Sequence, residues 1–220
     1  MVDSFLKFDE SVFKHEFVEM TEYSVLFAKS RSNYIKSIEK YLQKAVEAKK
    51  LTFEINWNTN TMFVRTNKMT RDPYIIIKAQ ELLELISKGV LLENCINLLE
   101  DGVFSEIIYI NVLTRNPTVY ENRRNRLSNP KVLKALEILS KTKITVGTKT
   151  VCVVGDHDGI DVVRNVVLKA FKNIHPAYEI KALMIKHKLS KDNIEGDWDR
   201  FLPKIKKGKE IKKPKIKTSK

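Results

Sequence analysis

The chain has 220 residues, 43% of them hydrophobic, and its 40 Lys and Arg against 27 Asp and Glu give a formal net charge of +13. This length accommodates one large domain or two small ones, and the hydrophobic fraction suffices for a core, which excludes a wholly disordered chain. The two cysteines lie far apart and no Cys-x-x-Cys or His-x-x-x-His spacing occurs, so neither a metal nor a cofactor is predicted. No apolar run is long enough for a membrane span, so we expect a soluble intracellular protein that binds no membrane.

The first 22 residues form an acidic, aromatic arm that is not expected to build a core of its own. Four Phe side chains stand three to five positions apart among carboxylates: Phe5, Phe8, Phe13 and Phe17. Such a spacing suits docking into a groove of a partner protein, or packing back on the arm's own domain. The sequence leaves both possibilities open.

A strand–helix–hairpin–helix pattern follows over residues 22–99. Apolar residues that recur every three or four positions predict the helices, and alternating ones predict the strands. Asp72 is expected to cap the second helix. The predicted elements are a strand over Tyr23–Phe27, a helix over Ser32–Lys49, strands over Leu51–Trp57 and Thr61–Thr66, a helix from Pro73 to a stop at Gly89, and a short helix over Leu91–Leu99.

The same order recurs over residues 104–190. Asn129 and Asp158 are expected to cap helices. His175 lies beside Pro176, which is expected to end the long helix, and its ring should cap the last carbonyl groups there or pack locally. The predicted elements are a strand over Phe104–Val112, helices over Pro117–Leu127 and Pro130–Ser140, strands over Lys143–Val146 and Thr150–Val154, a long helix from Asp158, and a helix over Tyr178–Leu189.

This repeated order is that of a KH-type unit, in which helices cover one face of a three-stranded sheet. The predicted fold class is α+β, with two tandem KH-like units, each a three-stranded sheet with helices on one face, an N-terminal arm and a basic C-terminal tail. The linker Glu100–Val103 is short, so one rigid body is expected. The predicted divisions are the arm 1–22, the first KH-like domain 23–100, the second 104–190, and a Trp/Phe anchor with a Lys-rich tail over 191–220.

Four short strings give a more specific indication. They are Asn122-Arg123-Arg124-Asn125-Arg126-Leu127, Asp72-Pro73-Tyr74-Ile75-Ile76-Ile77-Lys78-Ala79, the run from Lys172 to Lys186, and Trp198-Asp199-Arg200-Phe201-Leu202-Pro203. In their order along the chain they resemble a KH-domain assembly factor of the small-subunit processome that is known by its KRR-R motif. The resemblance extends from about Tyr23 to Pro203, and the chain is similar to a short, divergent member of that family.

The chain departs from the family pattern at two places. Asn122 stands where the motif begins with Lys. The family's second KH unit has a Gly-Pro-x-Gly loop between its first two helices, whereas this chain has Ser128-Asn129-Pro130-Lys131 without glycine. A GXXG loop clamps nucleotide backbone because glycine lets phosphates approach the main chain. We therefore expect no ordinary clamp, although the helix starting at Pro130 should still offer two or three N–H groups.

The candidate RNA contacts surround this junction. Guanidinium and ammonium groups bind phosphates, and Arg123 and Arg126 share one face of a helix. An ordinary solvated face with internal ion pairs is the alternative. The predicted contacts are Arg123, Arg124, Arg126, Asn129, Lys131 and Lys134.

The C-terminal tail concentrates positive charge. Residues 204–220 hold nine Lys and one Glu, a local charge of +8. A Lys/Pro-rich tail of this kind does not fold alone and reads as a polyanion-binding arm, a solubility tail or a nuclear import signal. The predicted phosphate contacts in it are Lys204, Lys206, Lys207, Lys209, Lys212 and Lys213.

The resemblance implies a non-enzymatic factor of the nucleus and nucleolus that supports small-subunit rRNA processing. Its expected partners are pre-rRNA and other assembly proteins, which would dock on the first KH-like domain and the arm; no small-molecule substrate is expected. A protein-only scaffold in the same particle is an alternative. A metal-dependent hydrolase built on Asp156, His157 and Asp158 is another, but this cluster between Gly155 and Gly159 is better explained as turn and cap residues.

Overall fold

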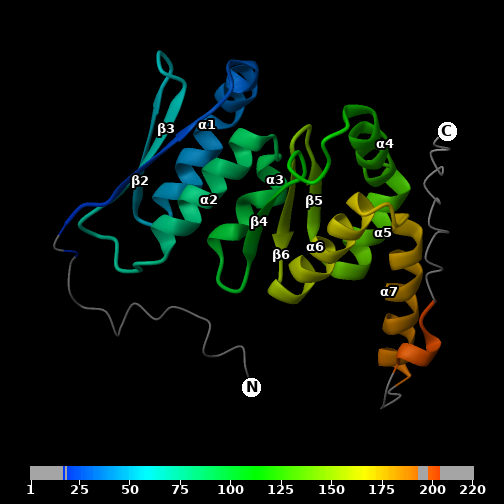
Figure 1. The fold of residues 1–220 in the computed structure, drawn as a ribbon. Helices are drawn as coiled ribbons and strands as arrows, with labels where there is room; N and C mark the ends of the chain where they lie inside the picture. The colour runs from blue at the N-terminus through cyan, green and yellow to red at the C-terminus, as the bar shows by residue number, and fades with distance from the viewer. Residues whose placement is uncertain (1–16, 18, 193–197, 204–220) are drawn as a thin grey trace, which may run out of the picture.

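The computed structural model describes residues 17, 19–192 and 198–203. Most of the predicted acidic arm and all of the predicted lysine tail lie outside these residues, so what was predicted for them stays a prediction. The described residues form two successive α+β units (Figure 1). None of the described helices is both long and apolar enough to cross a membrane.

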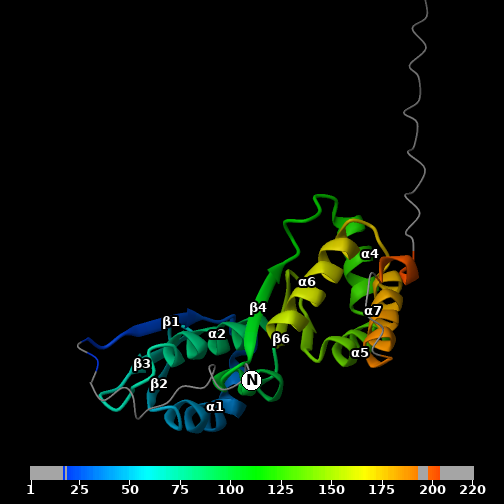
Figure 2. The ribbon, with the colours of Figure 1, turned by 90° about the horizontal axis from the view of Figure 1, so that it is seen from below.

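The first unit is built on an antiparallel sheet in the order β1-β3-β2, with β3 paired to both neighbours. Its helices cover one face of this sheet (Figure 2). The strands are β1 (Glu22–Leu26), β2 (Leu51–Asn56) and β3 (Thr61–Thr66). The helices are η2 (Lys29–Arg31), α1 (Ser32–Glu47), α2 (Ile75–Lys88), α3 (Leu92–Cys95) and η3 (Ile96–Leu99).

Helix α2 ends where the sequence predicts but begins later. Gly89 at its C-terminus has φ of 109°, a left-handed conformation that glycine adopts without steric cost. Asp72 does not cap the helix, and the prediction that it does is wrong. Its Oδ1 instead accepts a 2.8 Å hydrogen bond from the Tyr74 N–H, which closes a turn before the helix. The helix therefore starts at Ile75.

The second unit repeats the sheet, in the order β4-β6-β5, again antiparallel. Its helices α4, α5 and α6 cover one face, and α7 packs on α5 and α6. The strands are β4 (Phe104–Tyr109), β5 (Lys143–Val146) and β6 (Thr150–Gly155). The helices are α4 (Pro117–Leu127), α5 (Pro130–Ser140), α6 (His157–Phe171) and α7 (Pro176–Lys191), followed after the gap by η4 (Asp199–Phe201).

The helix starts of the second unit differ from two predictions. Helix α6 begins at His157 with Asp156 at its cap position, so Asp158 lies inside the first turn and is no cap. Pro176 begins α7, because proline fits the first helical position, where an N–H would have no partner. The His175 ring caps this new helix, and its Nδ1 accepts a 3.2 Å bond from the Ala177 N–H. The expected capping of α6 carbonyls by His175 is therefore wrong.

The two units share apolar contacts along their boundary. Cys152 and Val154 on β6 are buried in the core of the first unit, although they belong to the sheet of the second. Figures 1 and 2 show this sheet between α6 on one face and the α2–α3 region on the other. The Ser105 hydroxyl donates a 2.8 Å hydrogen bond across the boundary to Glu81. These contacts support the expectation of a single body.

Candidate nucleic-acid interface

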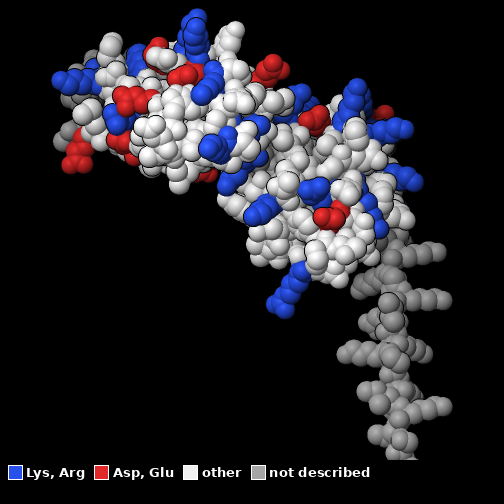
Figure 3. Space-filling model, turned by 90° about the horizontal axis from the view of Figure 1, so that it is seen from above, with Lys and Arg blue, Asp and Glu red and all other residues white. Residues whose placement is uncertain are grey.

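Positive charge within the folded part is concentrated on the second unit. Residues 103–191 contain 16 Lys and Arg and 7 Asp and Glu, a net charge of +9. Residues 21–101 contain 12 and 10, a net charge of only +2. Figure 3 shows both signs intermixed over the first unit and more basic than acidic groups over the second. Any polyanion is therefore attracted mainly to the second unit.

The junction between α4 and α5 consists of Ser128 and Asn129 alone. Asn129 caps α5 as predicted, with its Oδ1 accepting a 3.0 Å bond from the Lys131 N–H. The N–H groups of Val132 and Leu133 both bond to the Asn129 carbonyl, and Pro130 has none. The expectation that this helix start offers N–H groups to a phosphate is therefore wrong, because the chain itself occupies them.

The predicted arginines differ in their surroundings. Arg123 is turned inward: its guanidinium donates to the Phe171 carbonyl oxygen and, at 3.3 Å, to the Thr114 hydroxyl. Its Nε is buried without a hydrogen-bond partner, as is the Nε of Arg124. Arg126 is exposed and donates a 3.4 Å bond to the Asn173 side chain. The structure thus places Arg126 at the surface and Arg123 as a link from α4 to the end of α6.

Helix α5 presents one exposed stripe to solvent. Lys131, Lys134 and Ile138 recur at intervals of three and four residues, which places them on one helical face, and the exposed Lys141 follows at the C-terminus of the helix in a left-handed conformation. The Ile138 side chain is 68% exposed, which is unusual for isoleucine among charged neighbours. We call these four residues the α5 stripe. The sequence prediction included only Lys131 and Lys134, although the spacing itself would have indicated Ile138.

Strand β5 forms the other wall beside the α5 stripe. It is an edge strand, since among the described residues β6 is the one strand paired with it, and it carries the exposed Lys143. Glu137 ties the two walls together, because its Oε1 accepts a 3.1 Å hydrogen bond from the Ile144 N–H. The Tyr120 hydroxyl holds the turn between β5 and β6 by donating to the Thr148 carbonyl. The lysines of the α5 stripe and Lys143 therefore lie on elements that these hydrogen bonds hold in place.

The Asp156-His157-Asp158 cluster forms no metal site. His157 Nδ1 lies 3.6 Å from Asp161 Oδ2, so the imidazole pairs along its own helix. Over residues 17, 19–192 and 198–203, no group of three or more His, Cys, Asp and Glu is placed to hold a metal ion. The structure thus offers the hydrolase alternative no centre within these residues.

The first unit has no nucleotide loop at the corresponding position. The turn η2 runs directly into α1, and Arg31 there donates to the carbonyl oxygens of Ile86 and Val90 at 3.3 and 3.2 Å. This arginine therefore caps the end of α2 and does not face a ligand.

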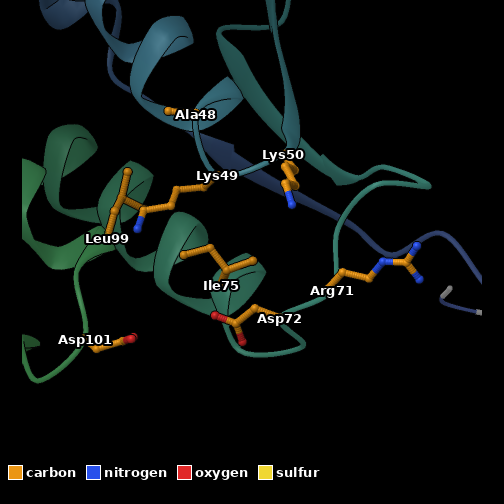
Figure 4. A pocket seen from close by; sticks show the side chains of 8 residues that line it. All are labelled: Ala48, Lys49, Lys50, Arg71, Asp72, Ile75, Leu99 and Asp101. Carbon is orange, nitrogen blue, oxygen red and sulfur yellow. The ribbon is translucent and has the colours of Figure 1, made fainter. Parts of the chain in front are cut away.

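A cavity of about 220 Å³ opens on the first unit between the end of α1 and the start of α2. In Figure 4, Lys49 and Lys50 come from the turn after α1, and Arg71 and Asp72 come from the loop before α2. Asp101 lies on the opposite side of this cavity from Arg71 (Figure 4). Charges of both signs line it, which suits a polar protein contact better than a polyanion.

Models of two domain families match the chain in tandem. Residues 21–101 match the Krr1 KH1 domain, and residues 103–191 match the second KH domain of the KRR1 small subunit processome component. The two ranges meet at the linker that separates the two sheets of the structure.

Several solved structures share the fold. A complex of a/eIF2alpha, Dim2p and rRNA from Pyrococcus horikoshii has 22% identity and a TM-score of 0.67, covering 78% of this chain and 96% of that chain. Dim2p from the same organism has 23% identity and a TM-score of 0.63, covering 74% and 98%. A protein of unknown function from Aeropyrum pernix has 14% identity and a TM-score of 0.69, covering 80% and 96%.

At these identities the solved structures bear on the fold alone, and they agree with two tandem KH domains. The family matches go further, because together they cover nearly all of the described residues. Three of the four strings lie within these ranges, and the ranges agree with the observed unit boundaries. The chain belongs to the family of the KRR1 small subunit processome component, ribosome-biogenesis proteins with two KH domains.

Proposed function

We propose that this protein is a non-enzymatic assembly factor of the small-subunit processome that binds pre-rRNA in the nucleolus. The observation that carries the proposal is the α5 stripe, which places three exposed lysines and one exposed isoleucine beside an edge strand on the basic unit. Membership of the family supports this choice of particle and compartment. The rRNA in the archaeal Dim2p complex is consistent with this choice of ligand.

The proposed mode of RNA binding follows from the state of the backbone N–H groups at the junction between α4 and α5. Because the backbone N–H groups at the start of α5 are already bonded, phosphates are held by side-chain ammonium groups and by Arg126. Ile138 gives a base an apolar surface, while the edge of β5 offers backbone groups other than the Ile144 N–H, which Glu137 already occupies. Ammonium contacts release counterions when they form, so the affinity depends strongly on salt. The lysines of the tail add the same kind of attraction.

The first unit and the acidic arm are proposed to hold other assembly proteins. Two observations support this division: the first unit has a net charge of only +2, and η2 and Arg31 fill the place of a nucleotide loop. A chain with one RNA face and one protein face would fix a segment of pre-rRNA relative to its neighbours in the particle.

Crosslinking in cells, followed by sequencing of the bound RNA, tests the proposal. We expect crosslinks to small-subunit pre-rRNA, both with the full chain and with a chain truncated after Leu202. The double substitution Lys131→Glu/Lys134→Glu should remove most of them. Lys40→Glu/Lys44→Glu is the matched control, since both lysines are exposed on α1 of the first unit and the charge change is equal.

The protein-only scaffold predicts a different result. In that case the chain enters the particle, but neither form is crosslinked above background, and the α5 substitutions leave particle entry unchanged. That outcome would overturn the RNA-binding role while keeping the place in the processome. Normal small-subunit rRNA maturation after complete depletion would overturn both.

A further inference from the structure

A cavity of about 530 Å³ lies where the two units meet. One wall comes from the first unit, with Asn94 at the end of α3 and Asn97 in η3. The other wall comes from the second unit, with Lys134, Ile138, Lys141 and Lys143 from α5 and the start of β5. A KH groove is formed within one domain, so a wall contributed by a neighbouring unit is an addition to it. The size is that of a ligand site.

The lining groups are available to a ligand. Over the described residues, the side chains of Asn94, Asn97, Lys134, Lys141 and Lys143 take part in no hydrogen bond or ion pair. Glu137 uses one oxygen on the Ile144 N–H. Asp156, the remaining acidic group, forms no capping bond. Three ammonium groups thus face two carboxylates, and the excess is positive.

The cavity continues the proposed RNA path. Lys134 and Ile138 belong both to the α5 stripe and to the lining of the cavity. Lys131 and Ile138 are seven residues apart on one helical face, which at 1.5 Å per residue is about 10 Å, and Lys141 follows just beyond the end of the helix. A strand lying along this stripe therefore reaches the cavity at the C-terminal end of α5.

The boundary between the units keeps the two walls at a fixed distance. Ser105 and Glu81 are hydrogen bonded across it at 2.8 Å. The Lys78 ammonium group holds the linker at the Glu100 carbonyl oxygen, 2.6 Å away. Val103, which also lines the cavity, packs against the core of the first unit. A site made from two units is precise only where such contacts hold them together.

We infer that this inter-unit cavity is a composite subsite that holds one nucleotide of a single-stranded RNA. The lysines contact its phosphates, Ile138 packs against the base, and the amides of Asn94 and Asn97 meet the base edge. A side-chain amide both donates and accepts, as the paired donor and acceptor of adenine require. The inference rests on the proposed function of the α5 stripe and extends it to the first unit, which would then take part in reading RNA.

The test measures binding of the full chain to a fluorescein-labelled oligoadenylate of about eight nucleotides, twice the number that one KH groove clamps. Asn94→Ala/Asn97→Ala should raise the Kd about tenfold, since two hydrogen bonds of ordinary strength are lost. Asn97→Asp, which keeps the shape but removes the donor and adds a negative charge, should weaken binding as well. Asn33→Ala, at an exposed position on α1, should leave the Kd unchanged.

Mass spectrometry of ultraviolet crosslinks should find the peptide that contains Asn94 and Asn97.

The outcomes separate the two proposals. If Lys131→Glu/Lys134→Glu abolishes binding while both asparagine variants match the wild type, the composite subsite is wrong and the RNA-binding function stands. If the wild type does not bind the oligonucleotide at all, both are wrong. Equal circular-dichroism melting curves for wild type and asparagine variants show that a change in Kd does not come from unfolding. A crosslinked peptide from the other end of α5 alone would also contradict the subsite.

Discussion

The ammonium group of Lys78 lies 2.6 Å from the carbonyl oxygen of Glu100, so an almost fully buried lysine of α2 holds the segment that joins the two units. The same group lies 3.3 Å from an Asp101 carboxylate oxygen. A buried cation is tolerated only where such partners replace water.

Lys78→Met should destabilise the protein by about 1–3 kcal/mol, because a charge-assisted bond is lost and a carbonyl group is left without its donor. Urea unfolding measures this effect. Hydrogen exchange should also become faster in residues 100–103. Lys40→Met, at an exposed position on α1, is the control and should change stability little. Equal stability of both variants would show that Lys78 does not fasten the linker.

Alanine substitutions of two arginines from the same motif should have opposite effects: one should lower stability, and the other should weaken RNA binding. Arg123→Ala should lower the free energy of unfolding by about 1–3 kcal/mol, because the inward bond to the Phe171 carbonyl is lost. Arg126→Ala, at an exposed position, should leave stability within about 0.5 kcal/mol and weaken RNA binding. Denaturant titration measures the stability of both variants, and fluorescence anisotropy measures their affinity for RNA. The reverse pattern would contradict the placement of the two side chains.

The salt dependence of RNA affinity should report the lysines of the α5 stripe. For single strands, each phosphate contact contributes about 0.7 to the slope of log K against log salt. Lys131→Ala/Lys134→Ala should therefore reduce that slope by about 1.4. The matched pair Lys40→Ala/Lys44→Ala should leave it unaltered. A parallel shift of all curves without a change in slope would mean that these lysines do not contact phosphates.

Close packing at Gly159 should make it intolerant of a side chain. A Cβ atom there would lie 2.3 Å from the Ser140 carbonyl oxygen, because α6 crosses the end of α5 at this point. Gly159→Ala should destabilise the protein by about 1–3 kcal/mol, even though alanine favours helix. Asn165→Ala, exposed on the same helix, should have no such cost. Thermal melting distinguishes the two, and equal melting temperatures would show that the helices move apart easily.

The Cys95 thiol should make the stability of the protein fall at alkaline pH. Burial raises its pKa to about 12, so the folded protein keeps the proton that the unfolded chain loses above about 9. This contribution to stability is complete below pH 9 and is lost as the pH rises toward 12. Cys95→Ala should flatten the fall in stability measured between pH 9 and 11. An unchanged pH profile would point to other groups.

The sequence predicted the order of elements well because local signals agree with the packing. Helices α4 and α5 begin at a proline preceded by an asparagine that caps them, and both boundaries were predicted to the residue. Strands β3 and β5 were also placed correctly. The errors at Asp72, Asp158 and His175 all concern helix ends, where the path of the adjoining loop decides which groups meet. No side chain caps the start of α2 or α6, and the His175 ring meets the start of α7 instead of the end of α6.

The residues of the candidate site were harder to predict from the sequence than the helices and strands. The motif drew attention to Arg123, whose inward direction depends on where α6 ends, 48 residues later. Ile138 follows from helical spacing alone, whereas Lys141 lies one residue beyond the helix in a left-handed conformation. Asn94 and Asn97 were out of reach, since nothing near them in the chain indicates that α3 and η3 lie beside α5.

The burial of Cys152 and Val154 in the core of the first unit has a consequence for synthesis. The chain leaves the ribosome from its N-terminus, and domains generally fold as they emerge. Here the α2–α3 region is complete more than fifty residues before β6 appears. During this interval its apolar flank stays uncovered, and the nascent first unit is open to aggregation or to capture by a chaperone. Folding of the first unit is therefore finished only when β6 of the second unit covers this flank.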